Sequence, residues 1–413
     1  MKMRILVFSF GLILLFQPSL AQDRAAIERQ FQSWLQETVW PRAKAKGVTR
    51  ETMQQALSDV TLDWKLPDLV PPGSARKTPK VQKQAEFGSP GRYFNPGSVQ
   101  GATSAGRKMA RRHGATLAAV EAETGVPARI ILAIWGRESG YGQVPIRHDA
   151  FRVLSTKAFM STRADYFTTE LVAALQIAEA GHQPARQMKS SWAGALGQPQ
   201  FMPSNYLSYA VDGNGDGAAD IWGSPEDTIA SIGNYLMKHG WVPARDWGFE
   251  VFVPQNVSCA LEGPDQGRPI QDWVEMGVRR FSGKPFPAHE LRGDGYLMMP
   301  AGRYGPAFLV TPNFYVLKEY NKSDLYALFV GHVGDRIQYG IGDFNDAWGK
   351  VGGLYRSDIA KMQQALEQKG HDVGGIDGLP GFKTRRSIGR WQETVGIEQT
   401  CFPDALMKTS LAP

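Results

Sequence analysis

The chain has 413 residues, of which 42% are apolar and 21% are charged. This balance excludes a disordered chain, a collagen-like repeat and a protein with many membrane spans, and the length predicts two or three compact domains. The formal net charge is +6, from 46 basic and 40 acidic side chains. No block of like charges marks a nucleic-acid-binding tail, so we expect no nucleic-acid partner. A weakly basic surface favours an anionic polymer as partner.

The first 21 residues have the pattern of a secretory signal peptide. Lys2 and Arg4 form a positive start, and a nearly continuous apolar run follows at 5–16. This run is too short to span a bilayer, for which about 20 residues are needed. Ala21 and the residue two positions before it are small, which suits cleavage of the chain after Ala21. Because no cysteine follows for a lipid anchor, we expect a periplasmic protein without a membrane anchor; a retained anchor helix is the alternative.

In chain order, the remaining pattern is mainly helical. Periodicity and turn residues predict a helical segment at 22–66, an extended segment at 67–101, a helix at 105–124, a helix that starts at Pro127, and helices at 163–181, 225–240 and 323–335. Between about 242 and 302, a strand pattern with frequent Pro and Gly predicts a small β-containing insertion. Residues 354–413 have a separate helix, Gly/Asp loop and helix pattern.

The helix predicted after residue 127 carries a carboxylate on its apolar face. Glu138 follows Ile131 by seven residues and Ile134 by four, and therefore falls on the same stripe. Desolvation and the negative end of the helix dipole would both raise its pKa, and a carboxylic acid protonated near neutral pH can act as a general acid. A structural glutamate paired with Arg137 or Arg147 is the alternative, which periodicity alone favours.

Residues 191–210 combine glycines, aromatic rings and neutral polar side chains. The hydroxyl of Ser191 and the amide of Gln200 suit sugar hydroxyls, and flat aromatic faces suit pyranose rings. An ordinary core turn with closely packed glycines explains the composition equally well.

The next segment has the spacing of a calcium loop. Asp212, Asn214 and Asp216 occupy positions 1, 3 and 5, a glycine stands at position 6, Ala218 at position 7 would offer its carbonyl, and Asp220 falls at position 9. Position 12 is a glycine instead of the usual glutamate, so the ligand set is incomplete. A tight turn of Asx and Gly residues is the alternative.

Two cysteines are present, Cys259 and Cys401. Export would permit a disulfide between them, but one sequence contains no geometry, so bridged and free cysteines both remain open. Two cysteines without clustered histidines do not make a zinc site.

Several motifs in order resemble the family of membrane-bound lytic murein transglycosylase B and its soluble relatives. They are FGSPGRYFNPGSV at 87–99, ESGYGQ at 138–143, RADYF at 163–167, AGALGQPQFMPSNY at 193–206, VDGNGDGAADIW at 211–222, NYLMKHGW at 234–241 and PNFYVLKEYNKSDLYAL at 312–328. The resemblance covers most of residues 25–340. Residues 354–413 resemble a short three-helix peptidoglycan-binding domain, through Asp377-Gly378 and Trp391-Gln392.

The resemblance implies a mainly α (α+β) fold. A lysozyme-like catalytic core would span 22–345, with the β-containing insertion at about 242–302 and the peptidoglycan-binding domain at 354–413. It also implies non-hydrolytic cleavage of the β-1,4 bond between MurNAc and GlcNAc in peptidoglycan strands, which leaves 1,6-anhydro ends. Glu138 would be the single general acid and base. No cofactor is needed for this chemistry, and calcium would be structural.

Further roles follow from positions in the family motifs. Ser191 and Gln200 would orient acetamido and sugar groups. The saccharide groove would be lined by Arg163, Tyr235, Asn313 and Tyr320, with Arg163 available to a lactyl or peptide carboxylate. Two alternatives stay open. A hydrolytic muramidase would need a second carboxylate about 5–9.5 Å from Glu138, and a catalytically inactive protein would only bind the wall.

Overall fold

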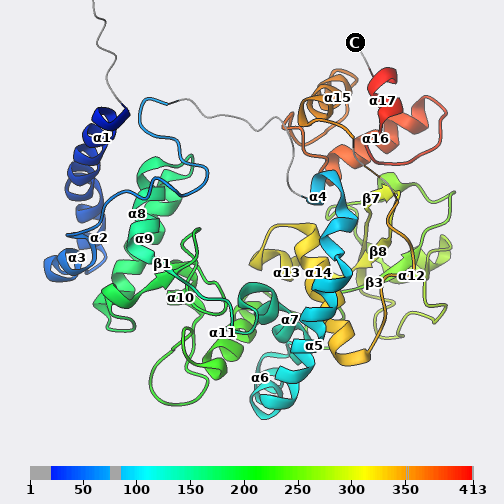
Figure 1. Cartoon of the computed structure of the whole chain (residues 1–413). Helices are drawn as coiled ribbons and strands as arrows, with labels where there is room; N and C mark the ends of the chain where they lie inside the picture. The colour runs from blue at the N-terminus through cyan, green and yellow to red at the C-terminus, as the bar shows by residue number, and fades with distance from the viewer. Residues whose placement is uncertain (1–19, 75–84, 350, 352, 412–413) are drawn as a thin grey trace, which may run out of the picture. The chain divides into compact units, whose positions relative to one another are not determined.

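The computed structural model describes residues 20–74, 85–349, 351 and 353–411 (Figure 1). Nearly all of the predicted signal peptide lies outside these residues, and that prediction stays a prediction. The chain forms two compact units. The N-terminal unit comprises 1–76, 148–188 and 192–194, and the main unit comprises 77–147, 189–191 and 195–413.

The N-terminal unit is helical. Its elements are α1 (Leu20–Trp34), a π-helical turn η1 (Leu35–Val39), α2 (Trp40–Ala45), α3 (Arg50–Leu57), β1 (His148–Asp149), α8 (Ala150–Met160), α9 (Ala164–Glu179) and a 3-10 turn η3 (Ala185–Gln187). Asp149 caps α8 by accepting a hydrogen bond from the Arg152 backbone N–H. The core contains Phe31 on α1 and Leu171 and Leu175 on α9, all fully buried.

The main unit holds the other helices. They are α4 (Ala85–Gly88), η2 (Pro90–Phe94), α5 (Pro96–Arg112), α6 (Gly114–Thr124), α7 (Ala128–Ser139), α10 (Pro203–Tyr209), α11 (Pro225–Lys238), η4 (Cys259–Leu261), α12 (Ile270–Glu275), α13 (Pro312–Tyr320), α14 (Asp324–Tyr339), α15 (Arg356–Gln368), α16 (Phe382–Thr394) and α17 (Ala405–Ser410). The prediction of one helix at 105–124 is wrong, because the chain leaves the helical conformation at His113 and starts α6 at Gly114. The predicted end at Gly125 is confirmed by its left-handed φ of +69°.

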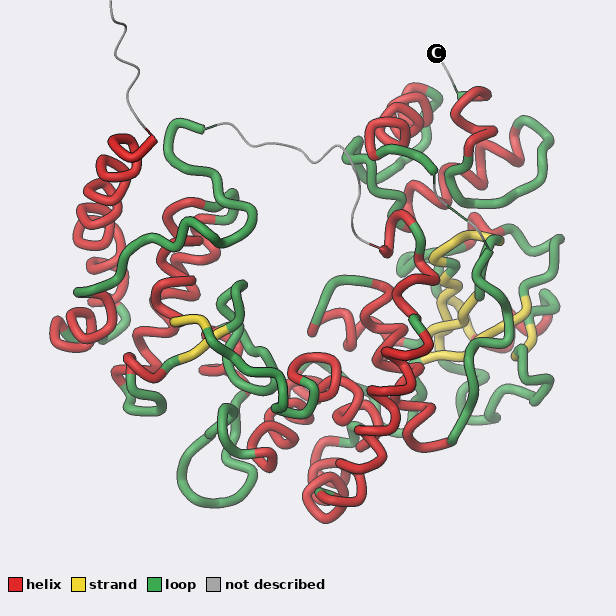
Figure 2. The backbone as a smooth tube through the Cα atoms, viewed as in Figure 1, coloured by secondary structure: helices red, strands yellow, loops and turns green. Residues whose placement is uncertain are grey.

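The strands of the main unit are β2 (Lys189–Ser190), β3 (Gly248–Phe252), β4 (Arg268–Pro269), β5 (Arg279–Arg280), β6 (Asp294–Met298), β7 (Pro300–Arg303) and β8 (Ala307–Val310). Five of them form a sheet in the order β4-β6-β8-β3-β5, yellow in Figure 2. The neighbours are antiparallel, with Phe249 opposite Leu309 and Leu297 opposite Leu309 on the other side. The strands extend to Val310, past the predicted bound of 302.

The last three helices have their own small core, formed by Leu366, Ile388, Trp391 and other apolar side chains. They are also bonded to the β-containing part. Cys259 and Cys401 form a disulfide, which settles the pairing that the sequence left open. The buried side chains of Arg385 and Glu262 form an ion pair across the same contact. Residues 354–411 are therefore docked onto the main unit and are not a freely tethered tail.

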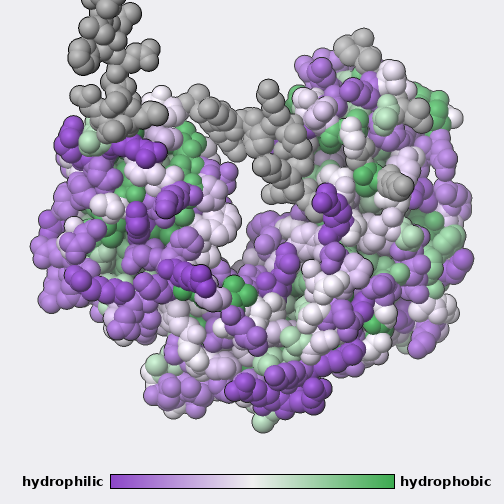
Figure 3. Space-filling view, viewed as in Figure 1, coloured by the Kyte–Doolittle hydropathy of each residue, from purple (hydrophilic) through white to green (hydrophobic). Residues whose placement is uncertain are grey.

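Helices predominate over short strands, as predicted. The surface seen in Figure 3 is mostly hydrophilic, with apolar residues in small scattered groups. No helix within the described ranges is long and apolar enough to cross a membrane.

Candidate active site

Glu138 lies in the last turn of α7, a helix whose interior is otherwise almost entirely buried. Residues 129–135 of this helix are buried, whereas Glu138 is partly exposed. Gly140 ends the helix in the left-handed conformation, with φ +57°. Gly136 has no room for a side chain, because a Cβ there would lie 2.5 Å from the ring of Tyr141. These glycines let the chain turn back closely against the end of α7.

The phenol of Tyr326 donates a hydrogen bond of 2.5 Å to Oε1 of Glu138. Tyr326 belongs to the first turn of α14 and is only 2% exposed. Burial raises the pKa of Glu138 to about 7, while the Tyr326 hydrogen bond and the charge of Arg137 act in the opposite direction. The carboxyl group is therefore partly protonated near neutral pH, as the sequence predicted from its place on the apolar stripe.

Helices α7 and α14 are joined at both ends. At the far end, Arg129 Nη1 lies 3.0 Å from Asp335 Oδ1. Arg129 lies in the first turn of α7 and Asp335 in the second half of α14, whereas Glu138 lies in the last turn of α7 and Tyr326 in the first turn of α14. The two helices therefore run antiparallel. This packing, and not the local sequence, brings a tyrosine 188 positions away onto the catalytic candidate.

An aromatic cluster lies beside this pair. The Tyr320 ring stacks parallel to that of Tyr326, with centroids 6.5 Å apart. Tyr320 also contacts Tyr235, at 4.8 Å, and Phe201, at 5.9 Å. The Tyr320 hydroxyl donates to the Pro199 carbonyl at 2.6 Å. The structure thus groups two predicted groove residues, Tyr235 and Tyr320, on one aromatic wall near Glu138.

The segment after residue 190 is held in a tight hairpin. The Ser191 N–H donates to the Ala195 carbonyl, and the Ala195 N–H donates back to the Ser191 hydroxyl. Gln200 has a left-handed φ of +54°, and its amide donates to the Gly197 carbonyl at 2.9 Å. Both predicted residues are half-buried and keep further hydrogen-bonding capacity for a ligand.

Gln198 ties this hairpin to α7. Its side-chain oxygen accepts from the indole N–H of Trp135 at 2.9 Å, and its amide donates to the Trp222 carbonyl at 3.1 Å. Trp135 precedes Glu138 by one helical turn, so Gln198 connects the hairpin with the helix that carries the carboxylate. The sequence indicated Gln198 only as one of several neutral polar groups.

Two other predicted groove residues make different contacts. Asn313 is fully buried, and its side chain bonds the backbone of Val242 and Arg245 with both its oxygen and its nitrogen. Its amide thus fixes the start of the β-containing part, and these contacts give no support to a role in binding saccharide. Arg163 belongs to the N-terminal unit, where it is exposed and lies 4.0 Å above the Tyr166 ring.

The loop at 212–220 is built on carboxylate-to-backbone hydrogen bonds. Asp212 accepts from the N–H groups of Gly215 and Gly217, and these bonds keep the pKa of Asp212 below its ordinary value. Asp216 accepts from the Ala218 N–H, and Asp220 from the Gly223 N–H. Within the described part of the chain, no three acidic, histidine or cysteine side chains converge as a metal-ligand group.

Sequence reasoning missed Tyr326. It sits in the motif at 312–328 that pointed to the family, and three residues after the cap at Ser323. Because it stands between Leu325 and Ala327, Tyr326 looks like an ordinary core residue. A hydrogen-bond partner on another helix leaves no local signal in the sequence.

Known proteins of one family resemble this chain. Residues 30–335 match the family described as Transglycosylase SLT domain. Membrane-bound lytic murein transglycosylase B of Escherichia coli is 33% identical over 218 residues, which are 52% of this chain and 57% of that protein. The chain thus spans little more than half the length of this curated relative.

Two solved structures are also similar. The crystal structure of SltB3 from Pseudomonas aeruginosa in complex with NAG-anhNAM-pentapeptide has a TM-score of 0.81 and 35% identity, and the match covers 92% of this chain and 99% of that one. The Escherichia coli lytic transglycosylase Slt35 in complex with calcium has a TM-score of 0.56 and 25% identity, over 76% of this chain and 93% of that one.

The fold and the site therefore define a transglycosylase of lysozyme-like fold. The chain belongs to the Transglycosylase SLT domain family, and within it to the lytic murein transglycosylase B family. The predicted family and fold class are confirmed.

Proposed function

We propose that this protein is a peptidoglycan lytic transglycosylase in which Glu138 serves as both general acid and general base. The observation that carries this proposal is a partly buried carboxyl group with a pKa of about 7, held by one phenol at the end of α7. A group with this pKa exchanges protons readily at neutral pH, which is what a single acid and base requires.

In the first step, protonated Glu138 gives its proton to the glycosidic oxygen between MurNAc and GlcNAc. The C1–O bond breaks, the GlcNAc end leaves as an alcohol, and positive charge develops at C1 of MurNAc. The Glu138 carboxylate that remains is stabilised by the Tyr326 hydrogen bond.

In the second step, the 6-hydroxyl of the same MurNAc attacks C1 and closes the 1,6-anhydro ring. Its proton passes to the Glu138 carboxylate, which returns to its starting state, so no water enters the balance. An intramolecular hydroxyl has a high effective concentration, and a second carboxylate to activate water is unnecessary.

The surrounding residues suit this substrate. Tyr235 and Tyr320 provide aromatic faces. Ser191 and Gln200 provide polar groups in the hairpin that is connected to α7. The complexes of SltB3 with muropeptides support binding of the same kind of polymer here, peptidoglycan glycan strands. Arg163 remains a candidate for a substrate carboxylate.

A hydrolytic muramidase is the second candidate. It would need a second carboxylate about 5–9.5 Å from Glu138. The solved and curated relatives to which this chain is similar are lytic transglycosylases, which favours the lyase over the hydrolase. The predicted alternative of an inactive wall-binding protein is disfavoured by the perturbed pKa of Glu138 itself.

Mass spectrometry of digested murein tests the proposal. The wild-type protein should release anhydro-muropeptides, whereas a hydrolase would give reducing ends and a binder would give no soluble product. The Glu138→Gln variant should fold and lose at least about 10²–10⁴ in rate. Reducing ends, or turnover of the variant within about tenfold of wild type, would refute the assignment.

Calcium at the loop of Asp212, Asn214, Asp216, Ala218 and Asp220 is a further proposal. The oxygen donors suit the ion, and the relative Slt35 was crystallised with calcium. The acidic side chains are not gathered in the described conformation, so binding would require them to turn toward the ion. Millimolar Ca²⁺ should raise the melting temperature, and this shift should be absent in Asp216→Ala. If calcium shifts the melting temperatures of wild type and Asp216→Ala equally, or shifts neither, the loop is a plain Asx turn without a calcium site.

Wall binding by residues 354–413, export, and removal of residues 1–21 complete the proposal. The docked helices of this C-terminal part support a rigid binding module next to the enzyme. Retention of Glu138→Gln on insoluble murein measures wall binding by the groove and this part together, without cleavage. N-terminal sequencing of the secreted protein tests cleavage after Ala21.

A further inference from the structure

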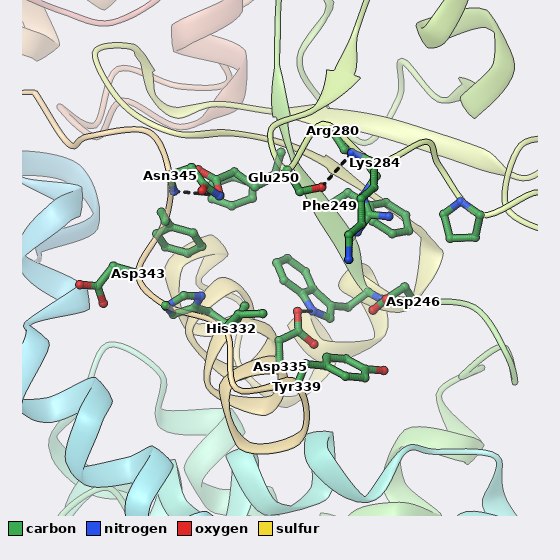
Figure 4. A pocket seen from close by; sticks show the side chains of 18 residues that line it. Asp246, Phe249, Glu250, Arg280, Lys284, His332, Asp335, Tyr339, Asp343 and Asn345 are labelled. Carbon is green, nitrogen blue, oxygen red and sulfur yellow. Dashed lines mark hydrogen bonds between the residues drawn. The ribbon is translucent and has the colours of Figure 1, made fainter.

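A cavity lies in the main unit, and Glu138 is not among its lining residues. Its volume is about 690 Å³, within the range of ordinary ligand sites (Figure 4). Strand β3, the segment around residues 280–287, the second half of α14 and residues 341–345 form its walls. Asp335 on this wall and Tyr326 near Glu138 are nine residues apart on α14, or roughly 13 Å along the helix.

One wall of the cavity carries excess negative charge. Asp246 and Asp335 share a single buried cation, Arg129, at 2.9 and 3.0 Å. Two carboxylates against one guanidinium leave one negative charge without a salt-bridge partner. Burial, the largest cause, raises the pKa of Asp335, and the nearby Asp246 acts in the same direction, whereas the charges of Arg129 and Arg280 lower it. A second cation in the cavity would balance this wall.

Two positive side chains, Arg280 and Lys284, also line the cavity, together with Glu250, whose carboxylate accepts hydrogen bonds from Asn345 and Asp346. Figure 4 shows Arg280 and Lys284 above Asp246 and Asp335. Lys284 is exposed, and within the described residues no carboxylate lies at salt-bridge distance from it or from Arg280. The Arg280 guanidinium lies 5.0 Å from the Phe249 ring, which holds it at the cavity wall.

Apolar side chains also line the cavity. Among them are Phe249, Phe308 and Phe344, and the rings of Phe308 and Phe344 meet at 5.1 Å. His332 also lines it, and burial lowers the pKa of His332 to about 4, so this side chain adds no charge at neutral pH. The lining therefore suits a ligand with one positive end, one negative end and an aliphatic body.

We propose that this cavity binds a short peptide that carries both a free ammonium group and a free carboxylate group. The ammonium group lies against Asp246 and Asp335, the carboxylate lies against Arg280 and Lys284, and the aliphatic part covers the phenylalanine rings. The choice of a peptide rests on the proposed function, because SltB3 was crystallised with a saccharide that carries a pentapeptide. The site would hold a stem peptide apart from the glycan groove.

The test is calorimetric titration of the full-length protein with an N-acetylated pentapeptide that has one lysine and a free carboxyl end. We expect saturable binding, and about tenfold weaker binding after acetylation of the lysine side chain or amidation of the carboxyl end. Asp335→Asn, which keeps an oxygen for the Trp247 indole, and Lys284→Glu should each weaken binding by about tenfold.

Lys369→Glu is the matched control, because this exposed lysine lies on the C-terminal part outside the cavity. It should bind the peptide as wild type does. Cleavage of peptide-free glycan should be unchanged in Lys284→Glu, which separates this site from the active site. The proposal is refuted if no saturable binding is seen. It is also refuted if the affinity is unchanged when either charge is removed from the peptide, or is unchanged in both Asp335→Asn and Lys284→Glu. None of these results affects the lyase assignment.

Discussion

Removing Arg385 should leave Glu262 as an uncompensated charge inside the protein. The two side chains are 2% and 1% exposed, and the guanidinium donates to both carboxylate oxygens, at 2.5 and 3.0 Å. Loss of one partner from a buried ion pair costs about 3–5 kcal/mol. Arg385→Met retains an apolar stem of similar reach, so the free energy of unfolding should fall by that amount. This contact fastens α16 to the β-containing part.

Denaturant unfolding of the oxidised protein at neutral pH measures this loss. Lys383→Met is the matched control, two residues earlier on the same helix, because its ion pair with Asp372 is 42% and 68% exposed. That variant should lose no more than about 1 kcal/mol. Adding Glu262→Gln to Arg385→Met should restore part of the stability, since the buried charge is then gone. A loss in Arg385→Met no larger than in Lys383→Met would refute the reasoning.

The other predictions concern the carboxylate and the disulfide. The pKa of Glu138 rises from an unfolded value of 4.5 to about 7 on folding, so its ionisation costs stability as pH increases through this window. Glu138→Gln should therefore be more stable than wild type by about 1–3 kcal/mol at pH 8. At pH 4 the two proteins should not differ, and denaturant unfolding measures both values. Tyr326→Phe removes a hydrogen bond that lowers the same pKa; the alkaline limb of the pH–rate profile should move to higher pH, and a limb that stays in place or moves down contradicts this role. Cys401→Ser opens a loop of 142 residues and should lower the free energy of unfolding by about 2–5 kcal/mol, which a reduced wild-type sample should reproduce.

The sequence alone determined the features that depend on neighbouring residues. The place of Glu138 on the apolar stripe follows from the helical period, and the helix ends at Gly125 and Gly140 follow from the freedom of glycine at positive φ. Desolvation at the end of such a helix was enough to predict the direction of its pKa shift. The strand at 248–252 likewise lies where a local strand pattern was predicted.

The tertiary structure decided which distant residues meet. Asn313 fits a family motif, yet its amide is used by the backbone around residues 242 and 245. Tyr326 looked like a core residue and instead holds Glu138, while Cys259 and Cys401 were unassigned until the C-terminal helices docked on the sheet. Periodicity shows which face of an element is buried. It contains no information about the partner across that face, because the partner is chosen by how the helices and strands pack together.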